Sequence, residues 1–259
     1  MTRHDAALTR RCLATVGLPD VIAVDGAQNV VVVGDDRVWR FPRRDPVAVH
    51  DHAARCTAAA SLGLGAPEVL DVVPGDVGTA HVVLRRLAGT PLLTARGQTV
   101  ADGVAEALER LRSARQWPWN PMPWDELWMR LSHVAEQQYA SLSQPREMLA
   151  AAQHAAAVAA TAPLCVLHGD LASDNLLIRG DGGFAGLLDW DSAVLGDPAM
   201  DTAAVLHVIS TADVVGVRSA TPAVDDDLRR FDAYAATWPL QAELWRSGLM
   251  PLHAGGTGH

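Results

Sequence analysis

The stretch between residues 164 and 201 constrains the fold of this chain more than any other part of the sequence. Three short apolar runs, at 164–167, 176–178 and 184–188, each predict a buried strand. A polar segment separates the first run from the second, and a Gly-Asp-Gly-Gly turn separates the second from the third. We therefore expect a hairpin with a polar loop, residues 168–175, beside the ends of its strands.

Three side chains with oxygen atoms lie at the ends of these predicted strands. Asp170 and Asn175 belong to the polar loop, and Asp189 directly follows the third strand. Because a hairpin brings the ends of neighbouring strands together, we expect the three side chains to converge. Phosphoryl transfer from Mg-ATP requires one group that orients the attacking hydroxyl and others that hold metal, and a protein kinase catalytic loop has Asp and Asn at this offset. Isolated Asp and Asn residues are usually turn formers. The prediction of a phosphoryl-transfer site therefore rests on all three residues occurring together at strand ends.

The residues from His168 to Asp201, HGDLASDNLLIRGDGGFAGLLDWDSAVLGDPAMD, resemble the aminoglycoside phosphotransferase family of antibiotic and small-molecule kinases. The resemblance implies an α+β, two-lobed protein-kinase-like fold with a β-rich N-lobe and a mostly helical C-lobe. It also implies that Asp170 is the catalytic base and that Asn175 and Asp189 hold Mg2+. The residues that would mainly brace the loop are His168, Asp197 and Asp201.

The order of the predicted elements agrees with such a division. We expect residues 1–87 to form the N-lobe, a nucleotide-binding sheet with one helix, and residues 88–259 to form the helical C-lobe with the catalytic loop and substrate site. The predicted N-lobe elements are strands at 21–24, 29–33, 37–41, 69–73 and 81–87 and a helix at 46–62. The predicted C-lobe helices are 100–111, 124–142, 145–161, 200–211, 225–238 and 239–248.

The nucleotide site is expected between the first three strands and residues 88–91, which we expect to form the hinge between the two lobes. The resemblance places the turn that contains Gly26, Gln28 and Asn29 over the phosphates. The chain contains no lysine, so any phosphate clamp must be an arginine, and Arg40 stands on the strand where kinases keep their lysine. Backbone groups near Arg86 and Leu87 are expected to meet the adenine. The alternatives to Arg40 as the phosphate contact are Arg37, Arg43 and Arg44.

One position departs from the family pattern. Counting back from Pro67, the position at which the family usually carries a helix glutamate is occupied by His52. A neutral histidine cannot supply the ion pair that steadies the clamp. Asp51, one position away, is the alternative partner for Arg40.

The acceptor is expected beside Asp170, in a site of acidic residues. Asp191, two positions past the proposed metal ligand, and Asp125 are our candidates for binding a substrate cation. Further acidic residues are Glu126, Asp225, Asp226, Asp227 and Asp232, although acidic residues that open a helix are also favoured by its dipole. The tryptophans at 117, 119, 124 and 128 either stack on a substrate or, more commonly for such clusters, pack helices together.

Composition limits the partners of this chain. Its net charge of −9 argues against a nucleic-acid partner and is compatible with a cationic ligand, although many soluble proteins are acidic. We find no signal peptide and no apolar run long enough to cross a membrane. The three cysteines have no metal-ligand spacing and indicate reduced thiols. We therefore expect a cytoplasmic monomer or homodimer without a membrane partner.

The expected reaction is transfer of the ATP γ-phosphate, with Mg2+ and with GTP as a possible donor, to a hydroxyl of a cationic antibiotic. The acceptor would be an aminoglycoside or a peptide of the viomycin or capreomycin type, since the segment DGAQNVVVVGDDRVWRFPRR loosely resembles the peptide-antibiotic kinases. O-phosphorylation would then confer resistance. The alternatives are a metabolite or macrolide kinase of the same fold, and a pseudokinase that binds a nucleotide without catalysis.

Overall fold

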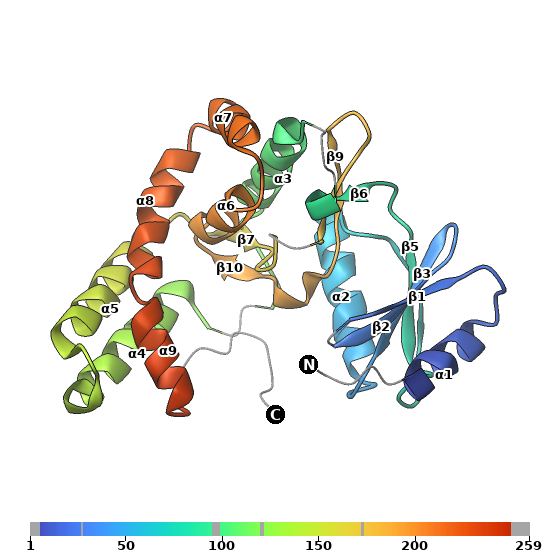
Figure 1. The fold of residues 1–259 in the computed structure, drawn as a ribbon, viewed down its shortest axis with the longest axis horizontal. Coiled ribbons are helices and arrows are strands. Elements are labelled where there is room, and N and C mark those ends of the chain that lie inside the picture. The colour runs from blue at the N-terminus through green and yellow to red at the C-terminus, as the bar shows by residue number, and fades with distance from the viewer. Residues whose placement is uncertain (1–5, 27, 95–98, 120–121, 172–173, 250–259) are drawn as a thin grey trace.

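The N-terminal region is built around an antiparallel sheet (Figure 1). The structure is a computed structural model that describes residues 6–26, 28–94, 99–119, 122–171 and 174–249. The sheet has the strand order β1-β2-β3-β5-β4. Its strands are β1 (Ile22–Asp25), β2 (Asn29–Val33), β3 (Arg37–Pro42), β4 (Val69–Val73) and β5 (His81–Arg85). All five were predicted from apolar runs between turn residues, with ends within two residues of those observed.

A helix packs on each face of this sheet. Successive strand residues point to opposite faces, so Val83 of β5 packs with Cys12 of α1 (Ala6–Val16), whereas Val82 packs with Ala53 of α2 (Ala48–Ser61). Helix α2 was predicted, but α1 was not. A usable signal for α1 was present, because Leu8, Cys12 and Val16 recur at helical spacing and belong to the apolar cluster between this helix and the sheet.

The C-terminal region is mostly helical. Its helices are α3 (Ala101–Ser113), α4 (Trp124–Gln137), α5 (Pro145–Ala159), α6 (Ala199–Leu206), α7 (Thr211–Ala220), α8 (Val224–Ala235) and α9 (Trp238–Arg246), with short 3-10 turns at Leu92–Thr94, Tyr139–Ser141 and Trp190–Ser192. The predicted helix 124–142 is wrong at its end, because α4 stops at Gln137. The predicted helix 200–211 ends at Leu206, and α7 was missed. Its start is marked by Ser210, whose hydroxyl accepts from the Asp213 amide at 3.1 Å.

Two small sheets position the polar loop. Strand β8 (Leu176–Ile178) pairs with β9 (Phe184–Leu187) in the predicted hairpin and also with β6 (Thr90–Pro91). Strand β7 (Cys165–Leu167), however, pairs with β10 (Val194–Gly196), a strand that the sequence analysis missed. The loop after β7 therefore runs from one sheet to the other.

The antiparallel sheet followed by a helical region confirms the predicted α+β class. The lobe boundary at residues 87 and 88 stays a prediction; β5 ends at Arg85 and β6 begins at Thr90. Among the described residues, no helix is both long and apolar enough to cross a membrane.

Candidate active site

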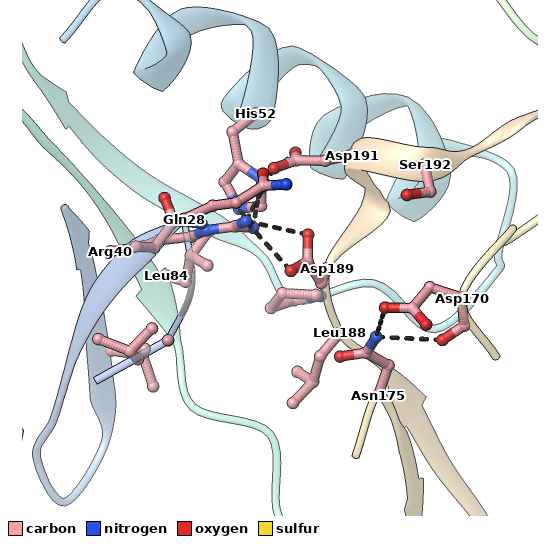
Figure 2. Close-up of a pocket in the computed structure, with 15 residues that line it drawn as sticks. Gln28, Arg40, His52, Leu84, Asp170, Asn175, Leu188, Asp189, Asp191 and Ser192 are labelled. Carbon is pink, nitrogen blue, oxygen red and sulfur yellow. Dashed lines mark hydrogen bonds and ion pairs between the residues drawn. The ribbon is translucent and has the colours of Figure 1, made fainter. Parts of the chain in front are cut away.

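A cavity of about 390 Å3 lies where the N-terminal sheet meets the loops after β7 and β9 (Figure 2). Both halves of the chain contribute to it. Its lining residues are Gly26, Gln28, Asn29, Val31, Val38, Arg40, His52, Pro67, Leu84, Asp170, Asn175, Leu188, Asp189, Asp191 and Ser192. The apolar wall of Val31, Val38 and Leu84 was not identified from the sequence. The alternation of side chains along β3 could have identified Val38 as a lining residue, because Val38 and Arg40 are two positions apart and share a face of the strand.

Asp170 and Asn175 are in direct contact at this cavity. The Asn175 amide nitrogen donates to Asp170 Oδ2 at 2.9 Å and to the Asp170 carbonyl at 3.1 Å (Figure 2). The backbone carbonyl of Asn175 accepts from Leu188 at 2.8 Å, which fixes the start of β8 beside the end of β9. The β8–β9 hairpin thus brings Asn175 close to the residue that precedes Asp189, as the sequence predicted.

His168 connects the polar loop to the end of β9. Its Nε2 lies 2.7 Å from the Leu188 carbonyl, and its Nδ1 lies 3.3 Å from the Asp170 amide. A neutral imidazole with its proton on Nε2 satisfies both contacts, since Nε2 then donates and Nδ1 accepts. The ring is fully buried against Trp190, with centroids 4.9 Å apart. One side chain therefore sets the spacing between Asp170 and Asp189.

Asp201, near the start of α6, holds the backbone of the same loop. Its carboxylate accepts from the His168 amide at 2.6 Å and from the Gly169 amide at 3.0 Å. Complete burial raises the pKa of Asp201 above its ordinary value, against the opposing effect of the two amides that donate to its carboxylate. Gly169 has φ +78°, and a Cβ there would lie 2.5 Å from the Ser192 carbonyl oxygen, so the turn requires glycine.

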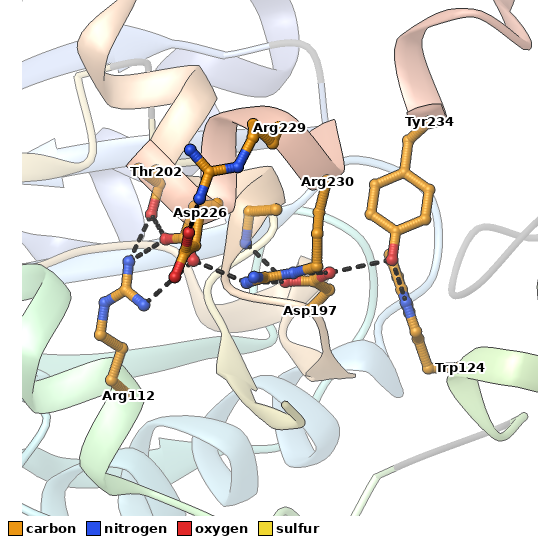
Figure 3. Close-up of polar contacts among 10 residues, drawn as sticks. Arg112, Trp124, Asp197, Thr202, Asp226, Arg229, Arg230 and Tyr234 are labelled. Carbon is orange, nitrogen blue, oxygen red and sulfur yellow. Dashed lines mark hydrogen bonds and ion pairs between the residues drawn. The ribbon is translucent and has the colours of Figure 1, made fainter. Parts of the chain in front are cut away.

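Asp197 is the centre of a buried network that attaches α8 to the loop after β10 (Figure 3). It accepts from Arg230 Nε at 2.7 Å and Nη2 at 2.9 Å, and from the Tyr234 hydroxyl at 2.9 Å. It also accepts from the amide of Ala199 at 2.9 Å. Burial raises the pKa of Tyr234. The residues of this network do not line the cavity. Their contacts hold α8 against the loop after β10.

Asp189 has an unusual backbone. Its φ of 59° makes it the one non-glycine residue with positive φ in the described part of the chain. This conformation costs free energy for an L-residue and persists where surrounding contacts enforce it, often at functional sites. The Asp189 carboxylate oxygens lie 3.0 and 3.1 Å from Arg40 Nη2. The turn thus aims a carboxylate into the cavity at the arginine of β3.

Arg40 is 8 % exposed and has polar partners on three sides. Its Nη2 donates to Asp191 at 2.7 Å, and its Nη1 contacts the ring of His52. With its amide oxygen facing Arg40, Asn29 accepts from Nη2 at 2.7 Å and Nε at 3.1 Å. Of the four candidate arginines, Arg40 is the one that lines the cavity.

Asp191, predicted to bind a substrate cation, is already paired with groups of this protein. Besides Arg40, it contacts His52, with 2.7 Å between Oδ1 and Nδ1. Burial alone would raise the pKa of Asp191, but the hydrogen bond from His52 and the charge of Arg40 outweigh it and lower the pKa to about 2. The role of His52 in this group was missed, because residues 139 positions apart give no local sequence signal.

The remaining predicted site residues divide into two groups. Gly26, Gln28 and Asn29 line the cavity. Arg86, Leu87 and Asp125 are not among its described lining residues. The Arg86 amide donates to the Asp36 carbonyl at 2.9 Å, so a backbone contact from Arg86 to an adenine would use its carbonyl, and this contact stays a prediction. Contacts from Leu87 to a nucleotide and from Asp125 to an acceptor stay predictions.

The donor set of the cavity suits a hard divalent cation. Asn175 and Asp189 offer amide and carboxylate oxygens, the ligands that Mg2+ prefers. A second group of potential ligands, His52, Asp189 and Asp191, has donor atoms within 4.8 Å of one another. Arg40 contacts all three of these side chains and already supplies their positive charge.

Comparison with known proteins agrees with this geometry. Residues 21–242 match the model of the phosphotransferase enzyme family. The viomycin phosphotransferase of Streptomyces vinaceus is 28 % identical over 208 residues, 70 % of each chain. The GDP complex of aminoglycoside 2'-phosphotransferase-IIIa has a TM-score of 0.68 at 17 % identity, over 95 % of this chain and 92 % of the other. A choline/ethanolamine kinase family protein from Mesorhizobium loti has a TM-score of 0.64 at 17 % identity, over 95 % and 89 %.

These structural similarities show a shared fold, and the family match covers most of the sequence. The resemblance seen in the residues from His168 to Asp201 is confirmed. The chain belongs to the phosphotransferase enzyme family and has its kinase-like fold.

Proposed function

We propose that this protein transfers the γ-phosphoryl group of ATP to a hydroxyl of a small cationic molecule. The observation that carries the proposal is the hydrogen bond between Asn175 and Asp170 on a cavity that Asp189 and Arg40 also line. A base, two oxygen ligands and a fixed cation on one cavity are the groups that phosphoryl transfer needs.

Each residue has a distinct role in this proposal. Asp170 accepts the proton of the acceptor hydroxyl and orients its oxygen for attack. Arg40 binds the nucleotide phosphates, for which a guanidinium offers two parallel donors. Asn175 and Asp189 hold Mg2+, whose charge neutralises the charge that develops on the transferred group. The wall of Val31, Val38 and Leu84 receives the base of the nucleotide.

We propose a basic peptide antibiotic of the viomycin type as the first candidate acceptor, and an aminoglycoside as the second. The relative with 28 % identity is a viomycin phosphotransferase, and this chain carries a net charge of −9. A negative protein raises the local concentration of cationic ligands. O-phosphorylation of such an antibiotic would protect the cell that makes this enzyme.

A phosphate-transfer screen tests the proposal. The purified protein is incubated with Mg2+ and either ATP or GTP, with viomycin, capreomycin, an aminoglycoside, a macrolide and an amino alcohol as acceptors. Mass spectrometry then identifies any product that has gained one phosphoryl group. We expect transfer from ATP to a cationic antibiotic. Transfer to the amino alcohol alone would assign the enzyme to metabolism, and nucleotide binding without any transfer would support the pseudokinase alternative.

A further inference from the structure

Arg40, the proposed phosphate clamp on β3, has no carboxylate partner on helix α2. In protein kinases the phosphate-binding lysine forms an ion pair with a helix glutamate, and that pair must be in place for activity. Helix α2 contains no glutamate. Its one acidic residue, Asp51, is exposed and absent from the lining of the cavity, so it does not take the place of the glutamate. His52 faces the cavity instead (Figure 2).

Asp189 and Asp191 both bring negative charge to Arg40 from the other half of the chain. Because Asp189 is assigned to Mg2+ in the proposed function, Asp191 is the carboxylate left for Arg40. Its two carboxylate oxygens are divided between two partners: Oδ2 lies 2.7 Å from Arg40 Nη2, and Oδ1 lies 2.7 Å from His52 Nδ1. Both oxygens are therefore engaged within the protein. This arrangement argues against the prediction that Asp191 binds a substrate cation.

His52 contacts both Arg40 and Asp191. Arg40 Nη1 lies 2.7 and 3.1 Å from the two ring nitrogens of His52. Asp191 can only accept, so Nδ1 must carry the proton that it receives, and Nε2 is then free to accept from Arg40. A neutral histidine in this tautomer satisfies the contact with Asp191 and the 3.1 Å contact between Nε2 and Arg40 Nη1. The 2.7 Å approach of Arg40 Nη1 to Nδ1 then joins two donors and is not a hydrogen bond. His52 is 5 % exposed, and burial followed by the charge of Arg40 lowers its pKa, which agrees with the neutral form.

We propose that Asp191, together with His52 as a neutral bridge, is the positioning pair for Arg40 and replaces the helix carboxylate of kinases. The proposal rests on the function proposed above, in which Arg40 binds nucleotide phosphates. A buried guanidinium requires a paired charge to stay in one orientation. Because Asp191 belongs to the Trp190–Ser192 turn and Arg40 to β3, this clamp assembles only when the N-terminal sheet and that turn are in contact.

The decisive experiment moves the carboxylate from position 191 to position 52 on α2. The dissociation constant of ADP is measured by calorimetry for the wild type and for variants whose thermal unfolding shows a folded protein. We expect Asp191→Asn and His52→Leu each to weaken ADP binding by about tenfold to a hundredfold, the effect of losing a hydrogen bond between charged groups. His52→Gln, which can still donate and accept, should stay within about threefold of wild type.

The double variant His52→Glu/Asp191→Asn returns the carboxylate to the helix. We expect it to bind ADP within about threefold of the wild type, a recovery that a merely structural role for either residue would not produce. Asp51→Asn is the matched control, because Asp51 is exposed on the same helix, and it should leave binding unchanged. Steady-state kinetics should show a raised KM for ATP in Asp191→Asn, with an unchanged KM for the acceptor.

Two results would overturn the proposal. If Asp191→Asn and His52→Leu bound ADP as tightly as the wild type, the pair would not position Arg40. If Asp191→Asn raised the KM for the acceptor and not for ATP, Asp191 would belong to the acceptor site. A wild-type protein that binds no nucleotide would instead reject the proposed function itself, so the two failures are distinguishable.

Discussion

At the scale of single residues, hydrogen bonds to two buried side chains hold the backbone of the polar loop at residues 168–170. His168 contacts both the Asp170 amide and the Leu188 carbonyl, and Asp201 receives two consecutive amides of the loop. Much of this could be predicted, because a His-Gly-Asp followed by Asn is a local pattern. The pairing of His52 with Asp191 could not be, since it depends on how two distant segments pack.

Replacing the proposed base tests the chemistry at this scale. We expect Asp170→Asn to lower kcat by about 10²- to 10⁴-fold, the usual contribution of general base catalysis, while leaving the affinity for nucleotide unchanged. Turnover and ADP calorimetry on the same preparation measure both quantities. Asp174→Asn is a suitable control, since Asp174 is exposed in the same loop and is not among the residues that line the cavity. Wild-type turnover in Asp170→Asn would rule out Asp170 as the base.

The backbone at Gly169 provides a second test. Because its φ is +78° and a Cβ would meet the Ser192 carbonyl at 2.5 Å, we expect Gly169→Ala to reduce the free energy of unfolding by about 1–3 kcal/mol. Gly180→Ala, at a position with no atom within 4 Å of the new Cβ, should be neutral or slightly stabilising. Urea unfolding measures both variants. Equal stabilities would show that the turn tolerates a side chain.

At the scale of elements, the site depends on which strands pair and on what holds the helices behind them. The β8–β9 hairpin was predictable from two apolar runs and a glycine-rich turn. The pairing of β7 with β10 was not, because three residues at 194–196 give too short a pattern to identify. Helix α8 is attached to the loop after β10 by Arg230 and Tyr234, which the sequence analysis did not identify, through Asp197, which it expected to brace the loop.

Removing the centre of the Asp197 network should loosen α8. Asp197→Ala would remove the buried carboxylate that accepts from Arg230, Tyr234 and the Ala199 amide, while Arg230 keeps its ion pair with Asp227. Because several hydrogen bonds to one buried charge are lost together, we expect a loss of about 3–5 kcal/mol in the free energy of unfolding. Tyr234→Phe removes one hydrogen bond to the same carboxylate and should cost about 1–3 kcal/mol. Chemical denaturation of both variants tests this order. A smaller loss for Asp197→Ala than for Tyr234→Phe would contradict it.

At the scale of the whole molecule, the cavity exists because the two regions meet. Residues from the N-terminal sheet and α2 contact residues from the loops after β7 and β9, and a shared apolar core continues from α2 through α3 to Trp190. The α+β class and the family could be predicted from sequence because they depend on dense local motifs. The packing of α1 and the ion pairs across the cavity could not, because they are properties of the assembled chain.

The stability of the assembled protein should depend on the protonation of His52. Burial, with the charge of Arg40, lowers the pKa of His52 in the folded state below its ordinary value of 6.5. The unfolded chain therefore binds the proton more tightly, so this contribution to stability is complete above about pH 6.5 and is lost as the pH falls toward the folded-state pKa. We expect Tm to fall as the pH is lowered from about 6.5 to about 5, and to fall less in His52→Gln. Identical slopes in the two proteins would contradict the assignment.

A crystal structure with a non-hydrolysable ATP analogue and Mn2+ tests the central claim most directly, since anomalous scattering locates the ion. The account predicts an ion bound by Asn175 and Asp189, phosphates on Arg40, and the Asp170 carboxylate facing the γ-phosphate from the acceptor side. A nucleotide bound outside this cavity, or an ion that touches neither Asn175 nor Asp189, would contradict it.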